Sequence, residues 1–496
     1  MTPPSGSNFA GRLLDGIGPG SCFIDAATRQ TISSDELQAT VRRFASGLKS
    51  AGVERGDRVL IGCTLSPSSS LVYLAAMYAG CVAVPVEERT LIGSVPEFAA
   101  ATGAKAVWTE ANSQLPSQDA GPVLRLHGDI GREANNPIPP ADCCSSDLAA
   151  LMATSGSTGI PRFVKVSHGN LIANTEAIIR SQILANDERA MLILPVSYCF
   201  GASVLHTHLY QGGSVVFDRR FMFPDKVLQA AAEYECTTFA GVPTVYNILL
   251  RRSGIRQISL PHLRRFLQAG GGLVRERVAE MRELFPSVRF YVMYGQTEAT
   301  ARITCMDPDR WHEKEGSVGQ PLDNLTALIV GDDGKSVETD QVGQLVVKGP
   351  SICQGYFNDA DETRRVFKNG WLNTGDLARQ DAEGFLWIEG RAGSFLKIRG
   401  TRVSLAEVEA KVASIPGVYE CGVCAVSHPE AGEALALFVV PDAPGHDLAN
   451  EIRHHLPPHW TLDSIRVVSE LPKTPAGKLA RAALAEMSKE HYGTAK

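Results

Sequence analysis

The stretch RFYVMYGQTEAT, residues 289–300, passes from an apolar run into a polar turn. Its first half is short and rich in aromatic and β-branched residues, as the buried strands of parallel sheets are. Gly295 then allows a sharp bend that exposes Gln296, Thr297 and Glu298. In helix-covered parallel sheets, ligands bind at the carboxyl ends of the strands. The stretch therefore predicts a buried strand and one edge of a binding site.

Similar apolar runs precede this stretch. They are RAMLILPV (189–196), SVVF (214–217), TTFAGV (237–242) and RRFLQA (264–269). Helical patterns such as PDKVLQAAAEYE and VRERVAEMRELF separate them, which predicts a parallel sheet covered by helices. The most apolar region, residues 59–86, is interrupted by a serine-rich segment. It therefore predicts a strand, a loop, a helix and a strand rather than a membrane span.

The pattern changes after about residue 320. Short strands with turn signals follow, among them the turn 331–334, and a smaller α+β unit begins after Arg391. We expect an α/β protein with a large N-terminal lobe of helix-covered, mainly parallel sheets and a small barrel-like β part. We place the two domains at residues 1–391 and 392–496, the second being a smaller α+β domain.

Charge and cysteine content restrict the function. The 496 residues carry a formal net charge of -6 with both signs scattered, so we expect neither nucleic acid nor an anionic membrane as a partner. The first residues lack the charged and apolar pattern of a secretory signal, so we expect none. With eleven cysteines, this predicts reduced thiols in the cytoplasm, without zinc or a disulfide framework.

One loop has the composition of a phosphate cradle. It consists of Thr154, Ser155, Gly156, Ser157, Thr158 and Gly159. Hydroxyl groups and successive backbone amides can surround a phosphate when glycines permit the bend, and Arg162 and Lys165 add positive charge nearby. The loop differs from the GxxxxGK[ST] pattern because no Lys-Ser/Thr pair follows its last glycine. Composition alone fits an ordinary polar loop equally well.

Three other positions carry candidate chemistry. Glu298 is a candidate magnesium ligand, or else a surface glutamate in a turn. Asp376, supported by Arg391, could accept the two hydroxyls of a ribose, or the two could form a salt bridge across a hairpin. Lys478 lies in PKTPAGK and is predicted to start the final helix, a position where a lysine is most often solvated.

The order TSGSTG, YGQTE, TGD followed by GR, and PKTPAGK resembles the adenylate-forming superfamily. That superfamily comprises acyl- and aryl-CoA synthetases, adenylation domains of peptide synthetases, and luciferases. The resemblance covers nearly the whole chain, including GSVGQPL (316–322) and LKIRGTRVSLAEVE (396–409). It implies that a carboxylate attacks the α-phosphorus of magnesium-ATP to give an acyl-adenylate and pyrophosphate. A thiol then displaces AMP to give a thioester.

The resemblance also implies roles for the motif residues. The loop from Thr154 to Gly159 would hold the β- and γ-phosphates. Tyr294 would lie against the adenine, Thr297 would contact the α-phosphate and Glu298 would serve Mg²⁺. Asp376 would hold the ribose hydroxyls, assisted by Arg391. The remaining residues expected at the nucleotide are Gly271, Gly295 and Gln296.

The C-terminal domain is expected to move between the two steps. In the family its lysine, here Lys478, bridges the substrate carboxylate and the α-phosphate. The domain then rotates so that a face around LKIRGTR, with Lys397 and Gly400, meets the thiol. The pivot is usually Asp or Lys, whereas this chain has Gly393, which can absorb large backbone changes.

The acid pocket is expected around Tyr198, Phe200, Gly201, Gly270 and Gly272. Gly201 stands where peptide synthetases have an aspartate that pairs with an α-ammonium, so we expect an aryl or acyl acid without an α-amino group. The thiol would be coenzyme A or the phosphopantetheine of a separate acyl carrier protein. The alternatives are a stand-alone amino-acid adenylation enzyme, a luciferase-like oxygenase and a silent nucleotide-binding protein.

Overall fold

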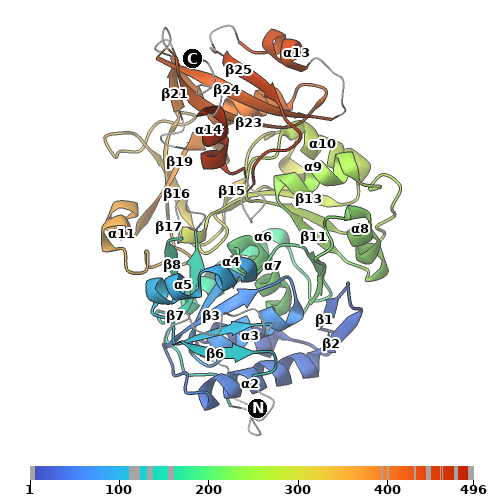
Figure 1. Cartoon of the computed structure of the whole chain (residues 1–496), viewed down its shortest axis with the longest axis vertical. Coiled ribbons are helices and arrows are strands. Elements are labelled where there is room, and N and C mark those ends of the chain that lie inside the picture. Colours follow the sequence, from blue (N-terminus) through green and yellow to red (C-terminus); the bar gives the residue numbers. More distant parts are fainter. Residues whose placement is uncertain are drawn as a thin grey trace.

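The computed structural model shows a large N-terminal body and a C-terminal part at one end of it (Figure 1). The described residues are 6–110, 123–130, 138–154, 161–391, 395–398, 401–428, 432–442, 448–457, 460, 462–473 and 479–489. Within these ranges, no helix has the length and apolar character needed to cross a membrane.

The first sheet of the N-terminal body has six strands in the order β6-β5-β3-β4-β7-β8. They are β3 (Arg58–Cys63), β4 (Val82–Glu87), β5 (Ala106–Thr109), β6 (Leu124–His127), β7 (Leu148–Ala153) and β8 (Phe163–Ser167). All neighbours are parallel except β7 and β8. Helix α3 (Pro67–Tyr78) connects β3 to β4, so the predicted strand, loop, helix and strand of region 59–86 are confirmed.

The second sheet has nine strands in the order β15-β14-β13-β12-β11-β9-β10-β1-β2. They are β1 (Cys22–Asp25), β2 (Gln30–Ser33), β9 (Arg189–Leu192), β10 (Ser214–Phe217), β11 (Thr238–Gly241), β12 (Arg265–Gln268), β13 (Arg289–Tyr294), β14 (Thr304–Cys305) and β15 (Gln320–Pro321). All five predicted runs form strands, and the six strands from β13 to β1 run parallel. The predicted helices are α8 (Pro224–Glu233) and α10 (Arg275–Leu284).

Helices pack against both sheets. They are α1 (Phe9–Gly16), α2 (Ser34–Ser50), α4 (Glu88–Gly93), α5 (Val95–Thr102), α6 (His168–Gln182), α7 (Cys199–Tyr210) and α9 (Pro243–Arg252). Residues of α1, α3, α6 and α7 join both sheets in one apolar cluster. Helix α6 begins with a capping box, in which the Ser167 side chain accepts from the Asn170 amide and the Asn170 side chain accepts from the Ser167 amide.

A third, antiparallel sheet forms the predicted β part. Its strands are β16 (Thr326–Val330), β17 (Gly343–Lys348), β18 (Phe367–Lys368), β19 (Trp371–Gln380) and β20 (Leu386–Arg391), and α11 (Ala360–Val366) precedes β18. The predicted turn forms, since the Gly334 amide donates to the Gly331 carbonyl at 3.0 Å. The turn does not connect β16 directly to β17. The chain after it first pairs with β16, where the Val337 amide donates to the Ile329 carbonyl.

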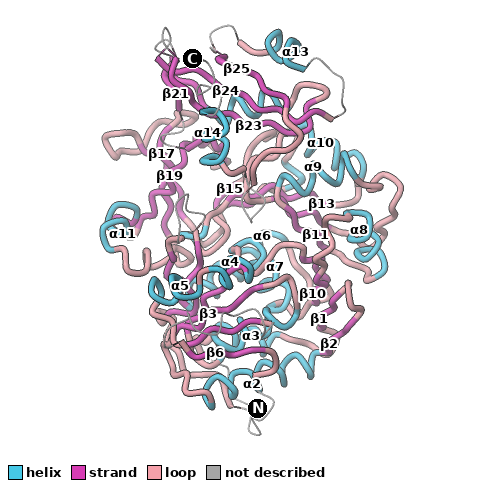
Figure 2. Tube along the Cα trace, in the orientation of Figure 1, coloured by secondary structure: helices cyan, strands magenta, loops and turns pink. Residues whose placement is uncertain are grey.

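The C-terminal part combines one sheet with flanking helices (Figure 2). Its strands are β21 (Phe395–Ile398), β22 (Thr401–Ser404), β23 (Val418–His428), β24 (Gly432–Pro441) and β25 (Leu462–Val467), and its helices are α12 (Leu405–Ala413), α13 (Leu448–His455) and α14 (Arg481–Lys489). The predicted strands lie in β23 and β24, and the final helix begins at Arg481, just after the expected start. One apolar cluster consists entirely of residues from Val403 onward, so this part has a core of its own.

Cys421 and Cys424 have a C-x-x-C spacing, which occurs in some redox and metal sites. Both lie on β23, where side chains three residues apart point to opposite faces. Cys421 packs against the core cluster that begins at Val403, whereas Cys424 belongs to a second cluster with Leu484. Burial raises the pKa of both thiols, so they are ordinary core residues.

The motif GSVGQPL joins the second sheet to the third. Ser317 is buried and its hydroxyl donates to the Leu386 carbonyl at 2.8 Å, while the Leu386 amide donates to the Gly319 carbonyl at 3.0 Å. Gly319 has φ +88° and packs on the backbone of Cys305, where an added Cβ would lie 2.1 Å from the carbonyl oxygen. Only glycine meets both conditions.

We predict that Gly319→Ala destabilises the protein by about 3 kcal/mol or more, because it combines a left-handed backbone angle with a backbone overlap. Chemical denaturation followed by circular dichroism measures the change. The matched control is Gly93→Ala, at the end of α4, where an added Cβ meets no atom within 4 Å. Equal stabilities for the two variants would contradict the packing assigned to Gly319.

Candidate functional site

Three residues predicted from two separate motifs, Tyr294 from one and Asp376 and Arg391 from the other, meet at the end of β13. The Tyr294 phenol donates to Oδ2 of Asp376 at 2.5 Å, and Nε of Arg391 donates to Oδ1 at 3.1 Å. Burial, together with the Asp376 charge, raises the pKa of Tyr294 well above its ordinary value, so the phenol remains a donor. The expected pair of Asp376 and Arg391 therefore exists, and Tyr294 is part of the same cluster.

The hairpin of β19 and β20 positions this carboxylate. Asp376 is directly opposite Arg391 in the strand register, and its amide donates to the Thr374 hydroxyl at 3.1 Å. Asp376 is buried, while the Arg391 side chain is 67% exposed. A carboxylate offers about four acceptor positions on its two oxygens. Tyr294 and Arg391 each contact a different one of these oxygens, so they fix the orientation of the Asp376 carboxylate.

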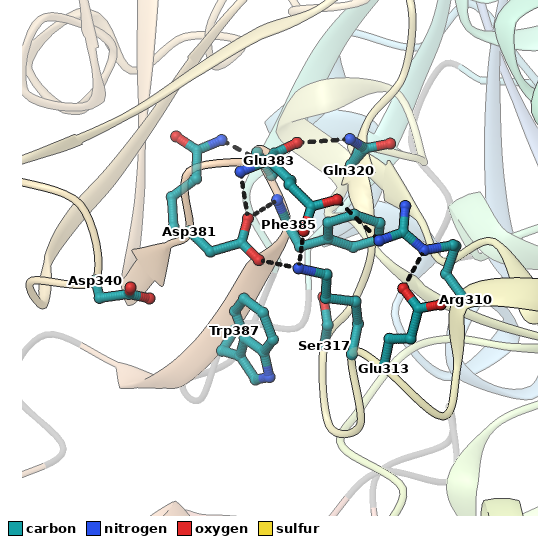
Figure 3. Close-up of polar contacts among 12 residues, drawn as sticks. Arg310, Glu313, Ser317, Gln320, Asp340, Asp381, Glu383, Phe385 and Trp387 are labelled. Atoms are coloured by element: carbon teal, nitrogen blue, oxygen red, sulfur yellow. Dashed lines mark hydrogen bonds and ion pairs between the residues drawn. The ribbon is translucent and has the colours of Figure 1, made fainter.

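The opposite end of the hairpin is fixed by a group that we call the hairpin clamp (Figure 3). It consists of Arg310, Lys314, Asp381, Glu383 and Phe385. Lys314 Nζ contacts Asp381 at 2.8 Å and also pairs with Glu383, while Arg310 contacts Glu383 at 2.8 Å. Both cations lie over the Phe385 ring, at 5.2 and 5.0 Å from its centroid. The clamp ties the hairpin to the segment between β14 and β15, which continues from β13, and so holds Asp376 near Tyr294.

Glu298 is held by a segment that sequence reasoning missed. The Tyr356 phenol donates to Oε1 of Glu298 at 2.8 Å, and the Cys353 amide donates to the Glu298 carbonyl at 3.0 Å. We call residues 351–357 the bridging segment. A Gly-Tyr pair in the middle of an irregular stretch contains no local signal for this contact, because its partner lies 58 residues earlier.

The bridging segment also pairs with β8, which leaves the predicted phosphate loop. The Lys165 amide donates to the Gly355 carbonyl at 2.8 Å, and the Phe357 amide donates to the Phe163 carbonyl at 2.7 Å. Thr154 closes the neck of the β7–β8 hairpin through its amide, which donates to the Arg162 carbonyl at 2.9 Å. The neck of the loop and Glu298 are thus connected through one continuous set of hydrogen bonds.

Several expected residues fall outside the described part of the chain. They are Ser155, Gly156, Ser157, Thr158, Gly159, Gly393, Gly400 and Lys478. Lys397 lies on β21, and its side chain is outside the description. Arg162 pairs with Asp359 and Glu362, each at 3.3 Å, so two carboxylates compensate its charge.

The expected acid pocket begins at the first turn of α7. Tyr198 precedes this helix and is half-buried, and burial raises its pKa to about 12. Thr297 lies beside the same turn, because its hydroxyl donates to Sγ of Cys199 at 3.6 Å. An added Cβ on Gly201 would lie 2.3 Å from the Pro195 carbonyl oxygen. Packing therefore requires glycine at position 201 whatever acid the protein binds. The absence of an aspartate at this position consequently says little about the substrate.

The glycine run after β12 lies beside the turn after β13, because these strands are parallel neighbours. Gly270 has φ +87°, and the Gly271 carbonyl accepts from Nε2 of Gln268 at 2.8 Å. An added Cβ on Gly272 would meet no atom within 4 Å. The glycine run therefore forms an open turn after β12. This turn lies beside the turn after β13, which contains Thr297.

Arg302 is a further residue that the sequence reasoning missed. It is among the largest fully buried side chains, and its guanidinium carbon lies 4.9 Å from the centroid of the Phe200 ring. Burial lowers its pKa to about 10, so it is charged at neutral pH. Desolvation costs several kcal/mol, whereas a buried cation–π contact contributes about 2 kcal/mol. The available signal was a basic residue within the apolar stretch ARITCM.

Among the described residues, no carboxylate forms an ion pair with the Arg302 guanidinium. Nε of Arg302 is buried without a hydrogen-bond partner. Asn174 of α6 fixes only the backbone, with its Nδ2 donating to the Arg302 carbonyl at 2.9 Å and its Oδ1 accepting from the Arg302 amide at 3.2 Å. The same part of the chain contains no group of three or more His, Cys, Asp and Glu residues arranged to hold a metal ion.

The hairpin clamp predicts a pH dependence of stability. Hydrogen bonds from Arg310 and Lys314 lower the pKa of Glu383 to about 2 from its ordinary value of 4.5. Because the pKa is lower in the folded state, the stabilisation is complete above pH 4.5 and is lost as the pH falls towards 2. We predict that Glu383→Gln lowers stability at pH 7 and makes the decline between pH 4.5 and 2 shallower.

Urea unfolding at a series of pH values measures this difference. Glu97→Gln, at an exposed position in the first turn of α5, is the matched control and should leave the pH profile unchanged. Parallel profiles for the wild-type protein and Glu383→Gln would contradict the role of the clamp.

Comparisons with known proteins identify the family of the chain. The model of the family described as AMP-binding enzyme matches residues 20–357, and that of the AMP-binding enzyme C-terminal domain matches residues 407–478. Feruloyl-CoA synthase from an Amycolatopsis species is 32% identical over 454 residues, covering 90% of this chain and 92% of its own.

Two solved structures are similar over almost the whole chain. ATP-bound MatB from Rhodopseudomonas palustris has a TM-score of 0.88 at 27% identity, covering 98% of this chain and 100% of its own. The o-succinylbenzoate CoA synthetase MenE from Bacillus subtilis, in complex with its acyl-adenylate intermediate, has a TM-score of 0.84 at 26% identity, covering 96% and 97%.

Proposed function

The chain belongs to the AMP-binding enzyme family, and on this premise we propose that it is an AMP-forming acid–thiol ligase. It uses ATP to convert a carboxylic acid into an acyl-adenylate, and then transfers the acyl group to a thiol. The observation that carries the proposal is the Asp376 carboxylate between Tyr294 and Arg391, at the strand end that also presents Thr297 and Glu298.

The nucleotide binds along the β13 turn and the β19–β20 hairpin. Asp376 accepts the ribose hydroxyls, and Arg391 holds the carboxylate in place. The Tyr294 ring lies against the adenine, with its phenol directed at Asp376. The residues assigned with them are Gly271, Gly295 and Gln296. The loop from Thr154 to Gly159 contacts the β- and γ-phosphates.

Glu298 fits a magnesium ligand. Mg²⁺ binds hard oxygen atoms, and in nucleotide sites one or two carboxylates suffice because phosphate oxygens and water complete the shell. Tyr356 orients Glu298 through one carboxylate oxygen, which leaves the other oxygen for the ion. When bound, Mg²⁺ neutralises charge on the phosphates.

In the first step an oxygen of the acid attacks the α-phosphorus of ATP, and the bond to pyrophosphate breaks. Thr297 donates to the α-phosphate, and the Lys478 ammonium stabilises charge on both the carboxylate and the phosphate. In the second step a thiol sulfur attacks the acyl carbon, AMP leaves and a thioester forms.

We assign residues 1–391 and 392–496 to separate domains with a pivot at Gly393. The apolar cluster confined to residues from Val403 onward supports this division. After adenylation the C-terminal domain turns the face with Lys397 and Gly400 towards the thiol. Rotation of this kind separates the two half-reactions in one enzyme.

The substrate is a small aryl or acyl acid, and coenzyme A is the thiol that we favour. The names of the feruloyl-CoA synthase and of the o-succinylbenzoate CoA synthetase support both choices. A separate acyl carrier protein, bearing the same phosphopantetheine thiol, is the alternative acceptor. The cytoplasm, which supplies ATP and coenzyme A, is the compartment that we propose.

Exchange of labelled pyrophosphate into ATP tests the first step. We expect exchange that depends on both the acid and Mg²⁺, with a panel of aryl, acyl and amino acids as probes. Mass spectrometry of products formed with coenzyme A, or with a phosphopantetheinylated carrier, identifies the acceptor. Clear binding of ATP with no exchange for any acid would instead indicate a silent nucleotide-binding protein.

We predict that Lys478→Ala slows adenylation by about 10²–10³-fold, since one preorganised donor to the transition state is lost. Transfer from a chemically prepared acyl-adenylate to coenzyme A should proceed at nearly the wild-type rate. Lys473→Ala, five residues earlier, is the matched control and should retain both half-reactions. An equal loss of both half-reactions in Lys478→Ala would contradict the assigned role.

A further inference from the structure

We propose that Arg302 binds a second carboxylate of the acid substrate, so that the preferred substrate is a dicarboxylic acid. The inference rests on the proposed function, because it concerns the far end of the acid that the enzyme activates. It follows from a charged side chain that is buried beside the acid pocket and lacks a protein acceptor among the described residues.

The surroundings of Arg302 provide contacts but no anion. Phe200 of α7 faces the guanidinium at 4.9 Å, and Asn174 of α6 binds the backbone. The sulfur groups near it are the thiols of Cys199 and Cys305. Burial raises the pKa of Cys305 to about 11, so this thiol is neutral at pH 7 and does not balance the charge.

The carboxylates of the nucleotide site are occupied by other partners. Glu298 accepts from Tyr356, while Asp376 accepts from Tyr294 and Arg391. Neither pairs with Arg302 in the structure. Because no described carboxylate pairs with Arg302, we assign the compensating anion to a ligand.

The position of Arg302 places this anion at the distal end of the acid. Thr297, which we assign to the α-phosphate, bonds Cys199 at the first turn of α7. The next residue, Phe200, covers the guanidinium. An acid whose reacting carboxylate lies at Thr297 can extend along this turn, and its second carboxylate then meets Arg302.

A carboxylate suits this guanidinium better than a neutral oxygen does. A guanidinium that faces an aromatic ring keeps its N–H groups in its own plane, where they match the two oxygens of a carboxylate. A phenol or an ether would accept one hydrogen bond and leave the charge uncompensated. The acid is therefore expected to carry a full negative charge at its distal end.

Matched acid pairs test the proposal directly. We would compare cinnamate with 4-carboxycinnamate, benzoate with terephthalate, and hexanoate with adipate, measuring kcat/KM for acid-dependent pyrophosphate exchange. In at least one pair the wild-type enzyme should favour the diacid by about 10²-fold or more, because a site built for a polar group rejects the analogue that lacks it.

Substitutions then assign the preference to Arg302. Arg302→Met should lower kcat/KM for the diacid by about 10²-fold while the value for the monoacid stays within a few-fold or rises, and Arg302→Lys should retain part of the preference. The matched control is Arg180→Met on α6, which removes an exposed ion pair with Asp323 and should leave the ratio unchanged. Thermal unfolding and ATP binding show whether each variant is folded.

The possible results separate the proposals. An unchanged ratio of diacid to monoacid in folded Arg302→Met would overturn the inference and leave Arg302 a packing residue. A preference of the wild-type enzyme for monoacids, or for a 4-hydroxy acid over its 4-carboxy analogue, would overturn it without any variant. Exchange absent with every acid, despite ATP binding, would instead refute the proposed function itself.

Discussion

The hydrogen bond between the Tyr294 phenol and Asp376 is the contact on which the site depends. It joins the end of a strand in the parallel sheet to a hairpin that belongs to a different sheet. Arg391 holds the other carboxylate oxygen, and the hairpin clamp fixes the far end of the hairpin. A buried carboxylate is costly unless it is paired, so this arrangement both stabilises the junction between the sheets and keeps an acceptor oriented for a ligand.

The bridging segment has the same effect on the other side of the site. It binds β8 through its backbone and Glu298 through Tyr356, so the neck of the phosphate loop and the turn after β13 are held at one edge. The backbone hydrogen bonds with β8 fix the position of the bridging segment, and the Tyr356 phenol orients the Glu298 carboxylate. Asp376 and Glu298 are therefore each held by hydrogen bonds from neighbouring elements, whereas the proposed catalytic residue Lys478 follows a part of the chain whose described residues form a core of their own.

Much of the fold was predictable because local patterns determine it. The run from Arg289 to Tyr294 and its four companions form strands, and the polar turn follows where predicted, since periodicity and glycine reflect the local backbone. Tyr356 and Arg302 escaped prediction because their importance comes from partners far away in sequence. Gly201 shows the opposite problem, because its motif position suggested substrate chemistry and packing against Pro195 accounts for it.

In the proposed function, the nucleotide binds beside Asp376 and the acid extends towards the buried cation Arg302. We propose that the acyl-adenylate forms at the junction of β13 with the β19–β20 hairpin. A crystal structure with a non-hydrolysable acyl-AMP mimic tests this most directly. We expect the ribose hydroxyls within hydrogen-bond distance of Asp376 and the phosphate mimic beside Thr297. A nucleotide bound away from both residues would contradict the account.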